Sequence, residues 1–246
     1  MSGTNVSTIA DLLSNAASAT PDAIWLTTPE TNKHYSWQNS VDRAREIACY
    51  LQGAGLSDGA SVAIAAANGA AASFAFLGAV VGGFRATPLN LLAGVKTLGF
   101  VLSHSKTELI LCADDCRTLV EDALATIPDA SHVKPQIISM DIDDGPRWIG
   151  SDITPLKVTD LRQPTTGTTG LFMYTSGTTG VPKGVLLSHG NLIAAGSNVC
   201  IAHKLKSTDT GMCVLPIYHI NGLCVTVMGT LVSKSGLVMP RRFSAT

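Results

Sequence analysis

Charged residues are scarce in this sequence of 246 residues: Asp, Glu, Lys and Arg make up 14% of it, whereas apolar residues make up 46%. The formal net charge is −1, and the sequence has no basic block. The electrostatic footprint expected of a protein that binds nucleic acid or an anionic membrane is therefore missing. A composition this apolar is typical of a globular α/β protein, and the length suits one large domain or two small ones. The composition predicts no particular oligomeric state.

Clustered cysteines and a secretory leader are also missing. The six cysteines are scattered; only Cys112 and Cys116 lie close together, and no histidine is near enough in sequence to suggest a zinc site. We expect free, buried thiols in a reducing compartment. The opening residues MSGTNVSTIADLL lack the basic segment and apolar core of a secretory signal. These features predict a cytoplasmic protein, or a peroxisomal one if a targeting signal lies beyond Thr246.

One long stretch without charge, residues 60–84, has the length of a membrane span. The dipeptide Asn68-Gly69, a strong turn signal, interrupts it. We therefore interpret residues 61–67 as a buried strand and residues 70–82 as a buried helix, because both faces of a parallel sheet are covered in α/β proteins. A membrane span is the alternative interpretation of this stretch.

Strand-like and helix-like segments alternate along the chain, which predicts an α/β fold with mostly parallel βαβ layers in a doubly wound sheet. The expected strands are residues 23–27, 33–36, 61–67, 108–113, 136–141, 171–175, 184–188, 212–215 and 236–240. The expected helices are residues 8–19, 38–52, 70–82, 91–104, 117–127, 191–203 (capped by Ser188 or Asn191) and 223–232. Residues 141–164 are acidic and show little periodicity, so we expect a surface excursion there.

The segment 165–184 concentrates threonine and glycine, with seven and five residues respectively, and has a lysine near its end. Glycines let backbone N–H groups approach an anion closely, hydroxyl groups add donors, and lysine supplies a positive charge. The pattern therefore predicts a cradle for a polyphosphate. Its expected binding residues are Thr175, Ser176, Gly177, Thr178, Thr179, Gly180 and Lys183.

This cradle does not fit the P-loop of nucleotide triphosphatases, G-x-x-x-x-G-K-[ST]. Lys183 follows Pro182 instead of a glycine, and Gly184 stands where that motif has a hydroxyl residue for magnesium. The residues that follow also read as a strand and not as a helix. We expect a two-stranded hairpin with a Thr/Gly tip; the alternative is a flexible surface loop without a ligand.

Residues 174–184, YTSGTTGVPKG, resemble the phosphate-loop signature of the adenylate-forming superfamily, which includes acyl-CoA synthetases, luciferases and non-ribosomal adenylation domains. Weaker similarities accompany it in the family's order across the whole chain. They are HYSW (34–37), LGAVVGGFRATPLN (77–90), SHGNL (188–192), LPIYHINGL (215–223) and PRRFSAT (240–246). The resemblance implies that residues 1–246 form the N-terminal part of the large AMP-binding domain, an incomplete one.

The same resemblance implies a two-step reaction with ATP, Mg²⁺ and coenzyme A. A carboxylate attacks the α-phosphorus of ATP to give an acyl-adenylate and pyrophosphate, and the thiol of coenzyme A then takes the acyl group. The family's segments for adenine, ribose and Mg²⁺, and the lysine of its small C-terminal domain, are not found in this sequence. No metal ligand is therefore assigned here, and we expect the 246-residue chain alone to be inactive. The alternatives are a truncated nucleotide- or phosphate-binding module and a scaffold without the chemistry.

The motif LPIYHINGL follows one expected strand and precedes an apolar helix. In the similar family motif the aromatic residue and the histidine lie beside the acyl pocket. The resemblance therefore implies that Tyr218, His219, Asn221 and Gly222 bind the acid, and that His219 orients the carboxylate or gates the pocket as a catalytic residue. A packed histidine with a satisfied hydrogen bond is the alternative. His189, in SHGN, is expected to help fix the turn after residues 184–188.

Acidic residues are missing from the last part of the chain, since no Asp or Glu follows Asp209. Relatives that activate amino acids typically place an acid near the LPIYHINGL region to pair with the substrate ammonium group, because a buried cation needs a partner. The sequence therefore predicts a carboxylic acid without an α-amino group as substrate. An amino-acid adenylation domain remains the less favoured alternative.

Overall fold

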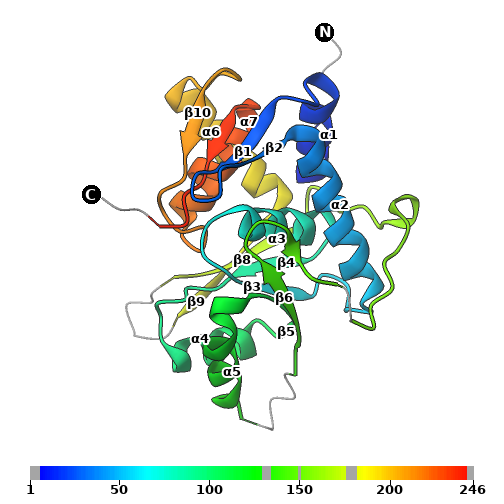
Figure 1. Cartoon of the computed structure of the whole chain (residues 1–246), viewed down its shortest axis with the longest axis vertical. Helices are drawn as coiled ribbons and strands as arrows, with labels where there is room; N and C mark the ends of the chain where they lie inside the picture. The colour runs from blue at the N-terminus through cyan, green and yellow to red at the C-terminus, as the bar shows by residue number, and fades with distance from the viewer. Residues whose placement is uncertain (1–5, 129–133, 149–150, 176–181, 243–246) are drawn as a thin grey trace.

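The computed structural model describes residues 6–128, 134–148, 151–175 and 182–242. Within these residues the strands form two sheets, with helices packed between and around them (Figure 1). The larger sheet positions the predicted phosphate hairpin, and the smaller sheet joins the beginning of the chain to its end.

The larger sheet has seven strands and a parallel centre. In spatial order they are β7 (Gly145–Pro146), β6 (Gln136–Asp141), β5 (Thr107–Ala113), β3 (Ser61–Ala65), β4 (Arg85–Pro88), β8 (Thr169–Thr175) and β9 (Lys183–Ser188). The strands from β6 to β8 are parallel, whereas β7 and β9 add to the two edges in antiparallel orientation. Every residue of β3 is buried because this strand lies in the middle of the sheet.

The smaller sheet pairs segments from opposite ends of the chain. Its order is β10 (Thr210–Met212), β11 (Gly236–Val238), β1 (Ile24–Thr28) and β2 (Lys33–Ser36). The parallel pair of β1 and β11 sets Leu26 opposite Leu237, and both side chains are buried. The sequence predicted these strands but not their separation into a second sheet, because strand patterns do not reveal pairing over such distances.

The helices of the described residues differ in how far they are buried. They are α1 (Ile9–Ala19), α2 (Trp37–Gly53), α3 (Ala70–Val81), α4 (Val95–His104), α5 (Arg117–Ala125), α6 (His189–His203), a π-helix (Asn221–Val227) and α7 (Met228–Ser233). Helix α3 is buried at every residue and contacts α2, β3 and β1, so it lies between the two sheets. Helices α4 and α5 lie on the opposite side of the larger sheet, at the bottom of Figure 1.

Local sequence explains several helix starts. A capping box satisfies backbone N–H groups at the beginning of α1, α2 and α6. At α6 the hydroxyl of Ser188 accepts from the Asn191 N–H, and the Asn191 side chain accepts from the Ser188 N–H. Ser188 is therefore the cap, which decides between the two residues that the sequence offered.

The predicted α/β fold with mostly parallel strands is confirmed. The uncharged residues 60–84 form β3 and α3, and no helix in the described parts of the chain is both long and apolar enough to cross a membrane. The sequence did not predict β4, because its residues Arg-Ala-Thr-Pro lack a strand pattern, or the two-residue strand β7. The strand expected at 212–215 is wrong except for Met212: the strand there, β10, covers Thr210–Met212, and residues 213–215 belong to no strand. The helix expected at 223–232 is the π-helix continued by α7.

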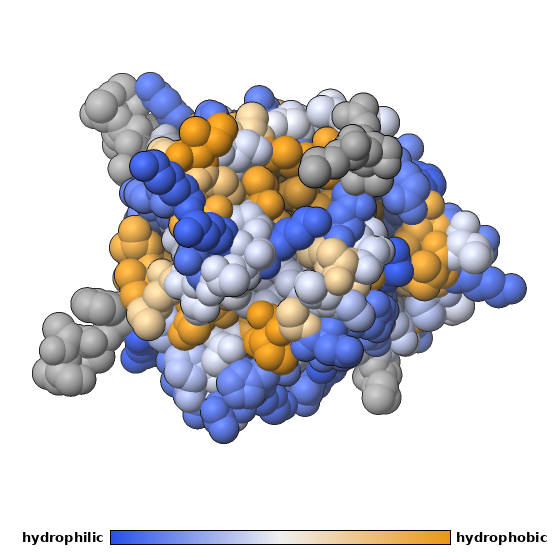
Figure 2. All heavy atoms as spheres, turned by 90° about the horizontal axis from the view of Figure 1, so that it is seen from above, coloured by the Kyte–Doolittle hydropathy of each residue, from blue (hydrophilic) through white to orange (hydrophobic). Residues whose placement is uncertain are grey.

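On the face of the molecule seen in Figure 2, surface hydropathy does not mark a site. Figure 2 views the end of the molecule that is uppermost in Figure 1 and shows separate apolar patches with hydrophilic side chains between them. Exposed apolar side chains occur on several elements, for example Ile201 on α6 and Met212 on β10. The candidate site is therefore located from the motifs and the cavities.

Candidate functional site

The predicted phosphate segment forms the expected hairpin. Strand β8 pairs antiparallel with β9, and this register places Thr175 opposite Lys183 and Tyr174 opposite Gly184. Both Thr175 and Lys183 are exposed. The first and last residues of the predicted cradle are therefore cross-strand neighbours, and they form the last pair of the hairpin before the residues that connect its two strands. The other predicted cradle residues, Ser176, Gly177, Thr178, Thr179 and Gly180, lie outside the described residues.

A pocket of about 260 Å³ lies beside this last pair of the hairpin. Tyr174, Thr175 and Pro182 line it from the hairpin, and Tyr218 lines it from the second motif. The remaining wall comes from the end of β4, the loop after it and α4, and consists of Pro88, Asn90, Ala93, Thr97, Leu98 and Val101. The structure thus brings the two motifs found in the sequence to one cavity.

The pocket wall is uncharged. None of its lining side chains carries a charge at neutral pH, and its polar groups are the threonine and tyrosine hydroxyls and the amide of Asn90. Among the residues that the structure describes, no cluster of His, Cys, Asp or Glu could hold a metal ion. An uncharged, hydroxyl-bearing cavity beside the exposed Lys183 suits a ligand that brings its own negative charge, such as a phosphate chain or a carboxylate.

Tyr174 anchors the hairpin to α4. Its hydroxyl lies 2.8 Å from Nδ1 of His104, and its ring stacks on Phe172 with ring centroids 5.0 Å apart. Burial raises the pKa of Tyr174 to about 12, and burial also raises the pKa of Tyr218. Both phenols therefore stay neutral near pH 7, so they add hydroxyl groups to the pocket but no negative charge that would repel an anionic ligand.

The second motif contributes unequally to the pocket. Tyr218 lines the cavity, whereas His219 is exposed beside it, with the two ring centroids 4.7 Å apart. Asn221 is also exposed and begins the π-helix. The structure therefore places Tyr218 in the wall and leaves the side chains of His219 and Asn221 outside the lining.

Gly222 is buried for a reason of packing. A Cβ atom at this position would collide with the carbonyl oxygens of Pro216 and Leu215. The Sγ of Cys213 bonds the Leu215 carbonyl at 3.3 Å and the Gly222 carbonyl at 3.5 Å. Glycine thus allows the π-helix to pack directly against the backbone that precedes Tyr218.

Sequence reasoning missed Asn68, which we had interpreted only as part of a turn signal. Asn68 follows β3 and is buried, with 8% of its surface exposed. Its side chain bonds the backbone of residues 213–217, which leads into Tyr218. The sequence feature that could have pointed to Asn68 is its position just after a central parallel strand, because ligands of open α/β sheets bind beyond the carboxyl ends of the strands.

His189 serves the fold and not the pocket. Its ring is fully buried, and Nδ1 accepts a hydrogen bond of 3.1 Å from the backbone N–H of Ile9. Burial lowers the pKa of His189 to about 4, so the ring is neutral with its proton on Nε2. The Val80 carbonyl lies near Nε2 but outside hydrogen-bond geometry. The turn that we expected His189 to fix is held by Ser188 and Asn191 instead, while His189 joins α6 to α1.

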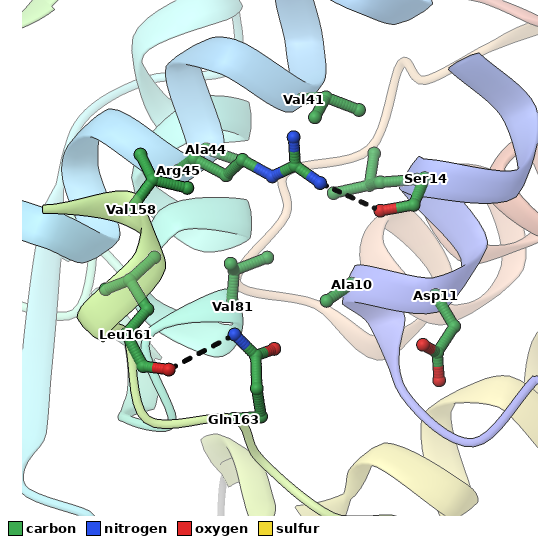
Figure 3. Close-up of a pocket in the computed structure, with 11 residues that line it drawn as sticks. Ala10, Asp11, Ser14, Val41, Ala44, Arg45, Val81, Val158, Leu161 and Gln163 are labelled. Atoms are coloured by element: carbon green, nitrogen blue, oxygen red, sulfur yellow. Dashed lines mark hydrogen bonds between the residues drawn. The ribbon is translucent and has the colours of Figure 1, made fainter. Parts of the chain in front are cut away.

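A larger cavity, of about 310 Å³, lies among α1, α2 and residues 158–163 (Figure 3). In this cavity Arg45 donates a hydrogen bond to Ser14, and the Gln163 amide donates one to the Leu161 carbonyl. It contains no residue of either motif. We therefore assign the candidate site to the smaller pocket, where the chemistry-bearing residues meet.

A parallel α/β core, a Thr/Gly hairpin and an uncharged pocket at the hairpin's end together define a domain of the adenylate-forming type. A sequence model described as "AMP-binding enzyme" matches residues 13–246. The chain belongs to this family of AMP-binding enzymes.

The curated relatives include one bacterial ligase and one plant ligase. The chain is 34% identical over 238 residues to a sulfoacetate–CoA ligase of Cupriavidus necator, and the matched region covers 97% of this chain and 46% of the relative. It is 29% identical over 244 residues to an oxalate–CoA ligase of Arabidopsis thaliana, with the same two coverages of 97% and 46%. The chain thus spans about half the length of these curated relatives.

Solved structures show the same fold. A Mycobacterium tuberculosis fatty acyl CoA synthetase superimposes with a TM-score of 0.81 at 21% identity, covering 97% of this chain and 46% of that one. ATP-bound MatB from Rhodopseudomonas palustris gives a TM-score of 0.79 at 22% identity, covering 96% of this chain and 46% of that one. At these identities the similarity establishes the fold alone.

Proposed function

We propose that the protein containing this chain activates a carboxylic acid with ATP and transfers the acyl group to coenzyme A. The observation that carries the proposal is the shared pocket of the phosphate hairpin and Tyr218. In the first step a carboxylate oxygen forms a bond to the α-phosphorus, the bond from that phosphorus to the bridging β-oxygen breaks, and pyrophosphate leaves. In the second step the thiol sulfur bonds the acyl carbon, AMP leaves with the carboxylate oxygen, and the thiol proton passes to solvent.

The hairpin residues would hold the phosphates. Thr175 and Lys183 lie opposite each other in the last pair of the hairpin. We propose that they and Ser176, Gly177, Thr178, Thr179 and Gly180 surround the β- and γ-phosphates. Their donors would stabilise the charge that grows on the leaving pyrophosphate, which is the main contribution a protein makes to such reactions. Bound Mg²⁺ would supply further charge neutralisation at these phosphates.

The second motif would hold the acid. We propose that Tyr218 forms the wall against the acyl group and that His219, exposed beside it, acts at the rim by orienting the carboxylate. Asn221 would complete the rim. Gly222 would contribute through its backbone, because its close packing fixes the segment that carries Tyr218.

The uncharged wall supports an acid without an ammonium group as the substrate, because it offers no carboxylate to pair with a buried cation. The volume of about 260 Å³ makes short acids the first to test. Relatives named for sulfoacetate and oxalate provide two of these candidates. We propose that the reaction takes place in the cytoplasm, with a peroxisomal location as the alternative.

Acid-dependent exchange of labelled pyrophosphate into ATP tests this function. The reading frame should be expressed to its own stop codon and assayed with a panel of short carboxylic acids and with amino acids. Exchange that requires a short acid supports the proposal. Exchange that requires an amino acid would instead identify an amino-acid adenylation domain.

A second candidate function is nucleotide or phosphate binding without catalysis. The observation in its favour is that Thr175 and Lys183, both exposed, lie opposite each other, which suits a phosphate whether or not a reaction follows. Saturable binding of ATP, with no exchange for any acid in the panel, would support this second candidate.

A further inference from the structure

The Asn68 side chain joins two segments that are far apart in the sequence. Its Nδ2 donates to the carbonyl of Leu215 at 2.9 Å and to that of Cys213 at 3.3 Å. Its Oδ1 accepts from the backbone N–H of Ile217 at 3.0 Å. One buried amide therefore satisfies three backbone groups of the segment that runs into Tyr218.

Only an amide of this length fits these partners. Two carbonyl oxygens require a donor and one N–H group requires an acceptor, and the asparagine side chain offers both. An aspartate would keep the acceptor but place a negative charge against two carbonyl oxygens. An alanine would leave buried backbone groups without partners, which costs more than the loss of an exposed hydrogen bond.

The segment held by Asn68 has little regular structure of its own. Residues 213–217 lie between β10 and the π-helix and belong to neither a strand nor a helix. The Cys213 N–H bonds the Val238 carbonyl at one end, and the His219 N–H closes a turn on the Pro216 carbonyl at the other. Between these two points, the three bonds from Asn68 and the bond from the Cys213 thiol to the Leu215 carbonyl fix the path of the backbone toward Tyr218.

The π-helix that follows strengthens this interpretation. Such helices are rare and are frequently found at functional sites. Gly222 in its first turn packs on the carbonyl groups of Pro216 and Leu215, and Leu215 is also bonded by Asn68. The clamp and the π-helix therefore hold the same short segment from two sides.

We propose that Asn68 is a positioning residue for the acid: it holds residues 213–217 so that Tyr218 stands in the pocket wall and His219 at its rim. The inference rests on the proposed function. Because the hydrogen bonds of the Asn68 side chain go to residues 213–217 and not to the hairpin, its loss should affect the acid and leave the binding of ATP almost unchanged.

The test compares Asn68→Ala and Asn68→Asp with a matched control, Ser73→Ala. Ser73 is also buried, and its hydroxyl bonds the Gly69 carbonyl and contacts Met239, but it does not touch residues 213–217. Hydrogen exchange of the Ile217 amide is measured first, in the 246-residue chain. We expect Asn68→Ala to lose protection there by about tenfold or more, Asn68→Asp to lose less because it keeps the acceptor for the Ile217 N–H, and the control to keep its protection. Unchanged protection at Ile217 would overturn the clamp, whatever the activity of the protein.

The second readout is pyrophosphate exchange in the reading frame expressed to its stop codon. We expect Asn68→Ala to raise the KM for the acid about tenfold while the KM for ATP stays within about twofold, with Asn68→Asp affected at least as much. Equal KM values for the acid in wild type and Asn68→Ala would show a merely structural residue and overturn the inference. If the wild type gives no exchange, the proposed function fails instead, and the hydrogen-exchange result decides whether the clamp stands.

Discussion

The buried His189 predicts how stability depends on pH. Its pKa is about 4 in the folded chain, against an ordinary value of 6.5 that we assign to the unfolded chain. Between these values the unfolded chain binds a proton that the folded chain excludes, so the free energy of unfolding falls as the pH drops from 6.5 toward 4. At about 1.4 kcal/mol per pH unit, a shift of about 2.5 units gives a total loss of about 3.5 kcal/mol, of which about 2 kcal/mol is present at pH 5.

Urea unfolding at pH 7.5 and pH 5.0 measures this effect in the wild type, His189→Gln and His203→Gln. His203 is exposed at the end of α6 and serves as the matched control. We expect His189→Gln to be less stable than the wild type at pH 7.5, because the ring that accepts from Ile9 is lost. Between pH 7.5 and pH 5.0 the free energy of unfolding of His189→Gln should fall by about 2 kcal/mol less than that of the wild type. That of the His203→Gln control should fall as much as that of the wild type. An equal loss in all three proteins would refute the assignment of a neutral, buried His189.

Three further predictions concern the site. Lys183→Ala should weaken ATP binding about tenfold or more, as measured by calorimetry, because charge-assisted bonds to phosphate are lost. Lys206→Ala, at another exposed lysine, should not weaken it. Equal ATP affinities of the wild type and Lys183→Ala would contradict the phosphate role of Lys183. Gly222→Ala should lower the free energy of unfolding in urea by about 1–3 kcal/mol through overpacking, while Gly167→Ala, where a Cβ has open space, should cost little. The 246-residue chain alone should bind ATP without catalysing exchange, and acid-dependent exchange by it would contradict this expectation.

Local patterns predicted most elements of the fold, but not the long-range pairing. The buried strand β3 and helix α3 were predictable because a covered parallel sheet requires apolar residues on both of its faces. The hairpin was predictable because two strand-like runs flank a Thr/Gly segment. The pairing of β1 with β11 was not, since period-2 patterns specify a strand and not its partner. Strand β4 was missed because an arginine and a proline interrupt its pattern.

The candidate site could be predicted where a motif carries its chemistry in side chains. Thr175, Lys183 and Tyr218 were named from the sequence, and the structure places Thr175 and Tyr218 in one pocket with Lys183 opposite Thr175. Their binding roles stay predictions. Asn68 could not be found in this way, because its partners are backbone groups about 150 residues further along the chain. The packing role of Gly222 likewise depends on a contact that only the folded chain creates.

The central claim is that the carboxylate itself attacks the α-phosphorus, and oxygen labelling tests it most directly. The substrate identified by the exchange assay is supplied with ¹⁸O in both carboxylate oxygens, together with ATP, Mg²⁺ and coenzyme A. The products are then analysed by mass spectrometry. The proposed chemistry predicts one labelled oxygen in AMP and none in pyrophosphate, because AMP leaves with the oxygen that formed the acyl-adenylate. Unlabelled AMP, or label in orthophosphate with ADP as the product, would contradict it.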